Sequence, residues 1–155
     1  MSDYVYGLNK SGLSVIKLLY NQKKNFDCWD DNKKIRFLVN KHIPKLNLKK
    51  INQKKLNLYK NIYLTPGISL NDKRFKNISN SKIKRDLNLY YASLRDEKIV
   101  AITGTNGKST TTKLIGNILK KKYRKIFVGG NLGEPLCNSI KKNIKYTHHV
   151  IELSS

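Results

Sequence analysis

A glycine-rich segment in the second half of the chain has the residue types of a phosphate-binding loop. Glycines let backbone N–H groups approach an anion closely, and the first N–H groups of a following helix point toward the same place. An apolar run, residues 99–102, precedes this segment, and a helix-like run follows it. The segment consists of Gly104, Thr105, Asn106, Gly107, Lys108, Ser109 and Thr110. We therefore expect it to bind the phosphates of a nucleotide.

The side chains of this segment fit the same chemistry. Lys108 can supply positive charge to the β- and γ-phosphates, and the Ser109 hydroxyl is a hard oxygen ligand of the kind Mg²⁺ prefers. The general pattern has a further glycine where this chain has Ile102, so the loop is of the shorter Gly-x-x-Gly-Lys-Ser form. The alternative is an ordinary strand-to-helix turn with a surface lysine.

Three apolar runs, at residues 98–102, 125–128 and 147–153, predict the strands that would carry this loop. Ligands of open α/β sheets collect at the carboxyl ends of the strands. Glu152 ends the last run, so we expect it to reach a Mg²⁺ ion held by Ser109. His148 and His149 are neighbours on this strand and point to opposite faces, which favours a structural role over a shared metal.

The beginning of the chain predicts a second nucleotide-binding unit. A short strand at residues 4–6 leads into a turn at 7–12 and a helix, and a second strand at 25–29 ends on Asp30 and Asp31. Dinucleotide folds place an acidic group at this distance to bind a ribose hydroxyl. Asn9 replaces the central glycine of that pattern, so we expect a nucleotide-diphosphate site rather than ordinary NAD binding. The alternative is that this strand–turn–helix unit has no ligand-binding role.

Between these units the sequence is lysine- and asparagine-rich. Residues 33–60 predict a solvated helix followed by short irregular elements. A strand at 61–64 ends in a tight turn at Thr65, Pro66 and Gly67. Residues 83–94 have helical spacing, and residues 93–97 read as a linker. We therefore place one domain at 1–94 and another at 95–155.

The formal net charge of +22 and the pI of about 10.1 would ordinarily suggest that the protein binds nucleic acid or an anionic membrane. Lysines supply most of this charge and are scattered along the chain, whereas only five residues are arginine, the type preferred for base and phosphate recognition. This pattern argues against a specific nucleic-acid partner.

Cys28 and Cys137 lack metal-ligand spacing. Without an apolar run long enough for a membrane span, we expect a cytoplasmic protein.

Six motifs in order resemble the landmarks of the Mur ligases, from one end of the chain to the other. They are Gly7-Leu8-Asn9-Lys10-Ser11-Gly12, Trp29-Asp30-Asp31-Asn32, Thr65-Pro66-Gly67-Ile68, the loop from Gly104 to Thr112, Gly129-Gly130-Asn131-Leu132-Gly133, and Glu152-Leu153-Ser154-Ser155. The resemblance implies an α/β fold with a Rossmann-like N-terminal domain, followed by the first part of a P-loop-type central ATP-binding domain.

It also implies an activity: the ATP- and Mg²⁺-dependent addition of D-glutamate to UDP-N-acetylmuramoyl-L-alanine, through an acyl phosphate, in peptidoglycan synthesis. By the family pattern Lys108 and Glu152 are catalytic, and Ser109 and Glu152 hold Mg²⁺. Residues 104–110 bind ATP. The substrate residues implied are Asn9, Lys10, Ser11, Asp30, Asp31, Thr65, Pro66 and Gly67, with Asn131 and Ser154 along the muramoyl-alanine arm.

Two features depart from the family pattern. Asn9 stands where a glycine is usual, and the sequence ends at Ser155, where Mur ligases continue into the rest of the central domain and a third domain. We therefore expect an N-terminal fragment that is inactive alone and monomeric when complete, with its last strand lacking neighbours. The rival hypotheses are a basic nucleotide- or nucleic-acid-binding protein, which would bind DNA at physiological salt, and a binding-only UDP-sugar module without ATPase activity.

Overall fold

The computed structural model describes residues 1–131, 133–140 and 143–154. The chain forms two compact units, residues 1–89 and 90–155, and each is described by itself. Both are built on parallel β-sheets whose strands are joined through helices or longer segments. The fold is therefore of the α/β class in both units.

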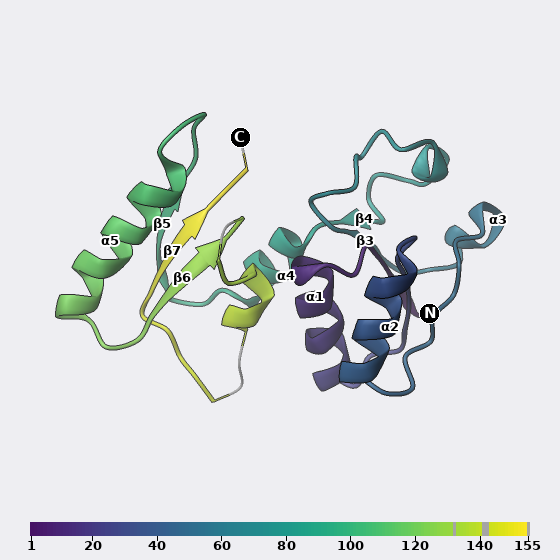
Figure 1. Cartoon of the computed structure of the whole chain (residues 1–155), viewed down its shortest axis with the longest axis horizontal. Coiled ribbons are helices and arrows are strands. Elements are labelled where there is room, and N and C mark those ends of the chain that lie inside the picture. The colour runs from purple at the N-terminus through teal and green to yellow at the C-terminus, as the bar shows by residue number, and fades with distance from the viewer. Residues whose placement is uncertain (132, 141–142, 155) are drawn as a thin grey trace. The chain divides into compact units, whose positions relative to one another are not determined.

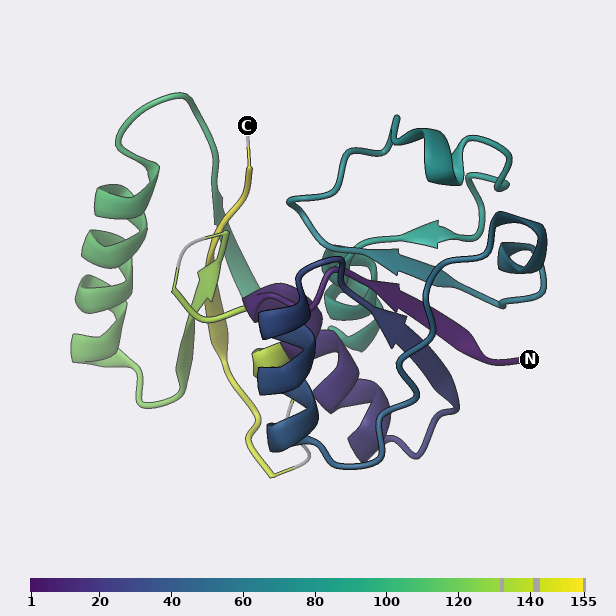
Figure 2. The same cartoon turned by 45° about the vertical axis from the view of Figure 1, so that its right-hand side comes forward.

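The first unit contains a four-stranded parallel sheet in the order β2-β1-β3-β4. Its strands β3 and β4 are labelled in Figure 1, and the arrows of the whole sheet lie side by side in Figure 2. Its strands are β1 (Asp3–Tyr6), β2 (Phe26–Trp29), β3 (Ile62–Leu64) and β4 (Ile83–Lys84). Every residue of β1 and β3 is buried, as expected for parallel strands covered on both faces. The helix α1 (Lys10–Asn21) connects β1 to β2 and buries the apolar stripe that its sequence predicts.

The other face of this sheet is covered by irregular segments instead of long helices. Tyr4 and Tyr6 project there and pack with Leu56 of α3 (Gln53–Leu56) and Phe75 of η1 (Lys73–Phe75). The helix α2 (Lys33–His42) buries only one side chain, in agreement with the expected solvated helix. The first unit thus has a compact core beneath a lysine-rich exterior.

The second unit contains a three-stranded parallel sheet in the order β5-β7-β6. Its elements are β5 (Lys98–Ile102), α5 (Lys108–Lys122), β6 (Ile126–Gly130), η2 (Leu136–Ser139) and β7 (His148–Glu152). The helix α5 lies along one face of the sheet (Figure 2). The core cluster of this unit joins Tyr90, Phe127, Leu136 and Ile151. Within the described ranges, no helix combines the length and apolar character needed to cross a bilayer.

Three predictions about these elements were wrong. The expected helix over 83–94 is a short strand, β4, followed by α4 (Asp86–Ser93), because Ile83 and Lys84 pair with β3. The turn expected at 129–133 begins later, since β6 extends through Gly130; Leu132 lies outside the described residues. The last strand, β7, does not lack neighbours: it pairs with both β5 and β6 and is the central strand.

Candidate nucleotide-binding sites

The loop between β5 and α5 has the backbone conformation that a phosphate-binding turn requires. Gly104 has a φ of +134° and Gly107, the N-cap of α5, has a φ of +77°. A Cβ at either position would meet open space, so the glycines are needed for their φ angles and not for close packing. The first turn of α5 carries no acidic residue. The positive end of the helix is therefore open to an anion.

The structure brings the two predicted magnesium ligands together at this loop. Ser109 Oγ donates a hydrogen bond of 2.8 Å to Glu152 Oε2, and Glu152 is only 3% exposed. A hydroxyl and a carboxylate are the hard oxygen donors that Mg²⁺ prefers. Among the residues that the structure describes, no cluster of three or more metal-ligating side chains occurs. A Mg²⁺ ion here would need phosphate and water as its remaining ligands, which is its usual environment in nucleotide sites.

The remaining predicted residues of the second unit occupy the same end of its sheet. The Nζ of Lys108 donates to the carbonyl oxygens of Gly104 and Thr105, so the lysine folds back over the loop. Thr105, Asn106 and Thr110 are exposed. The Asn131 N–H donates to the Glu152 carbonyl oxygen at 2.9 Å, and Ser154 is exposed two residues beyond that strand. Ser155 lies outside the described residues.

The two histidines of β7 have structural surroundings, as the sequence predicts. His149 is buried, and its Nδ1 lies 2.7 Å from the Tyr90 hydroxyl. Burial lowers the pKa of His149, against the smaller opposing effect of the Glu97 carboxylate. The His148 ring instead stacks near Tyr123, with 4.0 Å between ring centroids. Both imidazoles thus pack against aromatic side chains.

In the first unit, the expected substrate residues meet where the strand order reverses. The chain leaves β1 toward β2 on one side and leaves β3 toward β4 on the other, which makes β1/β3 the switch point where open α/β sheets bind ligands. The Thr65 N–H donates to the Tyr6 carbonyl oxygen at 3.2 Å. Gly7 has a φ of +88°, and a Cβ there would overlap the Thr65 hydroxyl. The turns after β1 and β3 are therefore in direct contact.

The start of α1 lies at this switch point, and its first turn contains no acidic residue. Asn9 is its N-cap, with an extended backbone (φ −64°) and no hydrogen bond from its side chain to the helix. Because this conformation suits any residue, Asn9 does not need the freedom of the glycine usual in the family. Lys10 is exposed, and the Ser11 hydroxyl is hydrogen-bonded to Asp86, whose pKa burial raises. Pro66 and Gly67 lie in the turn closed by the Ile68 N–H, which donates to the Thr65 carbonyl oxygen at 2.9 Å.

The two acidic residues after β2 have different roles in the structure. Asp30 accepts backbone hydrogen bonds from Leu8 at 2.7 Å and Asn32 at 2.8 Å, so it shapes the glycine turn. Asp31 accepts from Tyr6 Oη, Trp29 Nε1 and Arg74 Nη1, and its side chain remains 63% exposed. The Tyr6 hydrogen bond, with further help from Arg74, lowers the pKa of Asp31. Asp31 is thus the carboxylate available to a ligand.

Sequence reasoning missed two arginines of this site. Arg74 holds Asp31, and Arg85 donates to the carbonyl oxygens of Leu64, Thr65 and Ile68 around the Pro66–Gly67 turn. The signal that could have found them is their rarity. In a chain that meets most needs for positive charge with lysine, an arginine indicates a position where a planar, multidentate donor is required.

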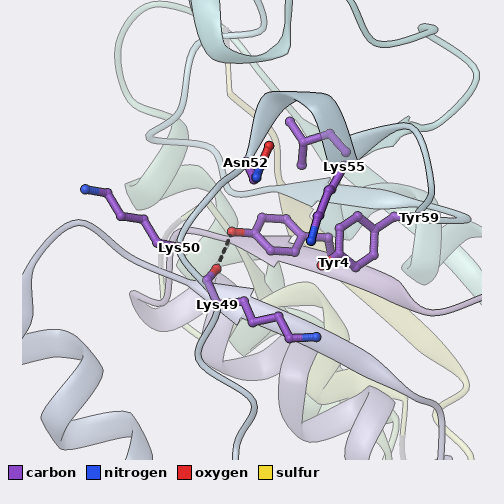
Figure 3. A pocket seen from close by; sticks show the side chains of 7 residues that line it. Tyr4, Lys49, Lys50, Asn52, Lys55 and Tyr59 are labelled. Carbon is purple, nitrogen blue, oxygen red and sulfur yellow. Dashed lines mark hydrogen bonds between the residues drawn. The ribbon is translucent and has the colours of Figure 1, made fainter.

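A separate cavity of about 230 Å³ lies on the same unit but not at the switch point (Figure 3). It lies beside Tyr4, in the first half of β1, whose hydroxyl donates to the Lys49 carbonyl oxygen at 2.8 Å. Two residues that line it, Lys49 and Tyr59, donate to the buried carboxylate of Asp27, as does Asn47. These contacts fasten the segment around α3 to the sheet, so this region is structural and not part of the candidate sites.

Each of the two α/β units has a helix that begins at the carboxyl end of a parallel sheet, an arrangement common in domains that bind nucleotides. Comparison with known families agrees: residues 2–85 match the family described as Mur ligase MurD-like, N-terminal domain, and residues 102–155 match the Mur ligase middle domain. The chain therefore belongs to the Mur ligase family.

Three curated relatives that are similar to this chain share one enzyme name. The chain is 38% identical to UDP-N-acetylmuramoylalanine--D-glutamate ligase of Wolbachia sp. subsp. Brugia malayi (strain TRS), with 97% of this chain and 31% of the relative aligned. The ligases of the same name from Rickettsia conorii (strain ATCC VR-613 / Malish 7) and Caldicellulosiruptor saccharolyticus (strain ATCC 43494 / DSM 8903 / Tp8T 6331) are 35% and 30% identical over 97% of this chain, and over 30% and 35% of their own lengths. The chain thus spans about a third of the length of these relatives.

Proposed function

We propose that this chain provides the substrate-binding domain and the first part of the ATP-binding domain of a ligase that joins D-glutamate to UDP-N-acetylmuramoyl-L-alanine. Its relatives are named for this reaction, and each of its two units has, at the carboxyl end of a parallel sheet, a helix whose first turn carries no acidic residue. The observation that carries the proposal is the contact between Ser109 and Glu152, because it places two oxygen donors suited to Mg²⁺ beside an anion-accepting loop.

In the second unit, we assign ATP to the loop and the start of α5. Residues 104–110 would surround the phosphates, and Lys108 would exchange its loop carbonyl partners for phosphate oxygens. Ser109 and Glu152 would hold Mg²⁺, which when bound supplies positive charge to the phosphates during phosphoryl transfer. Lys108 and Glu152 are thus the residues proposed to act in the chemical step.

In the first unit, we assign the uridine diphosphate of the substrate to the switch point. The diphosphate would lie against the start of α1, at Asn9, Lys10 and Ser11, because helix N-termini bind anions and the first turn of α1 contains no acidic residue. The uridine would lie toward Asp30 and Asp31, and the turn at Thr65, Pro66 and Gly67 would form the opposite wall. Asn131 and Ser154 are proposed contacts of the muramoyl-alanine part.

The proposal is tested with the protein isolated at its native length from the cells that make it. It is supplied with UDP-N-acetylmuramoyl-L-alanine, D-glutamate, ATP and Mg²⁺, and the amide product and ADP are measured by mass spectrometry. We expect both products, and no sustained release of ADP when D-glutamate is omitted, because the acyl phosphate then has no amine to attack it. If the native protein binds the UDP-sugar but forms no product, it is a binding module, and the ligase assignment is wrong.

The matched variants are Lys108→Ala and Lys113→Ala, which remove the same charge from the same helix. Lys113 is exposed and lies outside the loop. Removing one preorganised charge partner of a transition state typically costs about 2.7–4 kcal/mol, so Lys108→Ala should lose about two to three orders of magnitude in turnover. Lys113→Ala should retain normal turnover. Normal turnover in Lys108→Ala would contradict the assigned role of the loop.

A further inference from the structure

Arg74 joins groups from three separate segments of the first unit. Its Nη1 donates to the Tyr6 hydroxyl at the end of β1 and, at 2.7 Å, to Asp31 Oδ2 just after β2. Its Nε and Nη2 form a two-point ion pair with Asp72, at 2.9 and 2.5 Å. Its guanidinium also lies over the Tyr6 ring, 4.6 Å from the centroid. Arg74 therefore fastens the segment that follows β3 to the ends of β1 and β2.

The result of this arrangement is an exposed carboxylate with a fixed orientation. Asp31 accepts hydrogen bonds from Tyr6, Trp29 and Arg74, yet its side chain is 63% exposed. A carboxylate can accept about four hydrogen bonds, so one position is left for a donor from outside the protein. A carboxylate this exposed ordinarily rotates among rotamers, whereas three donors hold this one still. A preorganised acceptor of this kind favours ligand binding.

Stability alone does not explain the cluster. Ion pairs as exposed as Arg74–Asp31 contribute little to the free energy of folding. The chain also uses lysine for most of its positive charge, yet it has an arginine here. The planar fork of arginine can engage Asp72 through two nitrogens and still reach Asp31, whereas a lysine offers a single charged nitrogen.

We propose that Arg74 is a positioning residue of the nucleotide-sugar site, which holds Asp31 ready to accept a hydrogen bond from the uridine part of the substrate. This inference rests on the proposed function, because Asp31 receives such a donor only if the first unit binds UDP-N-acetylmuramoyl-L-alanine. Arg74 acts through Asp31 and does not itself touch the ligand. Its effect on binding should therefore vanish when Asp31 cannot serve as the acceptor.

A double-mutant cycle tests this dependence. Calorimetric titration of the native-length protein with UDP-N-acetylmuramoyl-L-alanine gives Kd for the wild type, Arg74→Gln, Asp31→Ala and the double variant. Alanine at position 31 has no side-chain acceptor. We expect each single variant to weaken binding by about tenfold, as for a lost hydrogen bond to a charged group, and the double variant to match Asp31→Ala within about twofold. Lys73→Gln, which removes the same charge from the exposed neighbouring residue, should bind normally.

The outcomes separate the two proposals. No binding by the wild-type chain contradicts the proposed function. Normal binding by the wild type with an unchanged Kd for Arg74→Gln overturns the positioning role alone. Losses that multiply in the double variant also overturn it, because they would show that Arg74 acts independently of Asp31.

A second readout covers the case in which Arg74→Gln disturbs the fold. The pKa of the Asp31 carboxyl, measured by ¹³C NMR without ligand, should rise in the folded Arg74→Lys variant as the paired donor is lost, and this variant should bind with intermediate affinity. An unchanged pKa for Asp31 together with wild-type affinity in Arg74→Lys would overturn the inference.

Discussion

The hydroxyl of Ser109 donates a 2.8 Å hydrogen bond to Oε2 of Glu152, although the two residues are 43 positions apart in the chain. The contact exists because β7 lies directly beside β5 in the sheet, so the end of β7 is adjacent to the loop that follows β5. Two donors that the sequence separates are thereby placed together. Their proximity supports a shared ion more strongly than either residue does alone.

Ser109→Ala should weaken the binding of ATP in the presence of Mg²⁺ and have a smaller effect without it. The variant removes one oxygen ligand and leaves the buried Glu152 carboxylate without its hydrogen-bond donor, at a cost of about 1–3 kcal/mol. Titration of ATP with and without Mg²⁺ measures the difference. Ser109→Thr keeps the hydroxyl and serves as the control. Equal losses in both conditions would mean that Ser109 does not act through the metal.

The sequence predicted the strand, glycine-rich turn and helix around Ser109, and the position of Glu152 at the end of a strand, because local patterns carry this information: glycines, a following helix, and a polar residue at the end of an apolar run. It did not predict that β7 is the central strand, because pairing between strands depends on contacts far apart in the chain. It also failed at Ile83 and Lys84, whose helical spacing was overridden by pairing with β3. Arg74 and Arg85 were missed for the same reason, since their partners lie on other elements.

Arg85→Ala should destabilise the first unit and displace the turn after β3. The Arg85 guanidinium donates to three backbone carbonyl oxygens, those of Leu64, Thr65 and Ile68. Burial partly desolvates the Arg85 guanidinium and so lowers its pKa. Removing the side chain leaves the three carbonyl oxygens without their donor. We expect the free energy of unfolding to fall by about 1–3 kcal/mol, measured by urea denaturation. Arg95→Ala, at an exposed position, is the matched control and should have little effect.

His149 should make the second unit less stable in acid. Burial lowers the pKa of His149 in the folded state, while in the unfolded chain the pKa is about 6.5. As the pH falls below about 6.5, the folded protein therefore binds fewer protons than the unfolded chain. The stability that neutral His149 contributes above this pH is lost as the pH falls through the folded-state pKa. The free energy of unfolding should decrease by at most about 1.4 kcal/mol per pH unit for this one proton.

The variant for this test replaces both members of the buried pair, as Tyr90→Phe with His149→Phe. Replacing both hydrogen-bonding partners by apolar groups avoids an unpaired buried hydroxyl, so stability at neutral pH should change little. The acid sensitivity should decrease. His148→Gln, at a half-buried position on the other face of the strand, should leave it unchanged. If the double variant loses stability in acid as the wild type does, other titratable groups cause the loss and the prediction for His149 is wrong.

Gly12→Ala should damage the proposed nucleotide site of the first unit more than Gly67→Ala does. A Cβ on Gly12 would overlap the carbonyl oxygen of Gly7 and lie 3.0 Å from Thr65 Cγ2, so α1 would have to move away from the turns that it joins. A Cβ on Gly67 would meet nothing within 4 Å. Overpacking of this kind costs about 1–3 kcal/mol, and the backbone oxygen cannot rotate aside as a side chain would.

The two alanine variants are compared by urea denaturation and by titration with UDP-N-acetylmuramoyl-L-alanine. Because the contact of Gly12 with Gly7 places the start of α1 against the switch point, Gly12→Ala should lose both stability and affinity. Gly67→Ala should keep its stability, so any loss of affinity there reports on the ligand alone. If Gly12→Ala binds the ligand as the wild type does, the diphosphate does not depend on the position of α1, and the site must lie elsewhere on the unit.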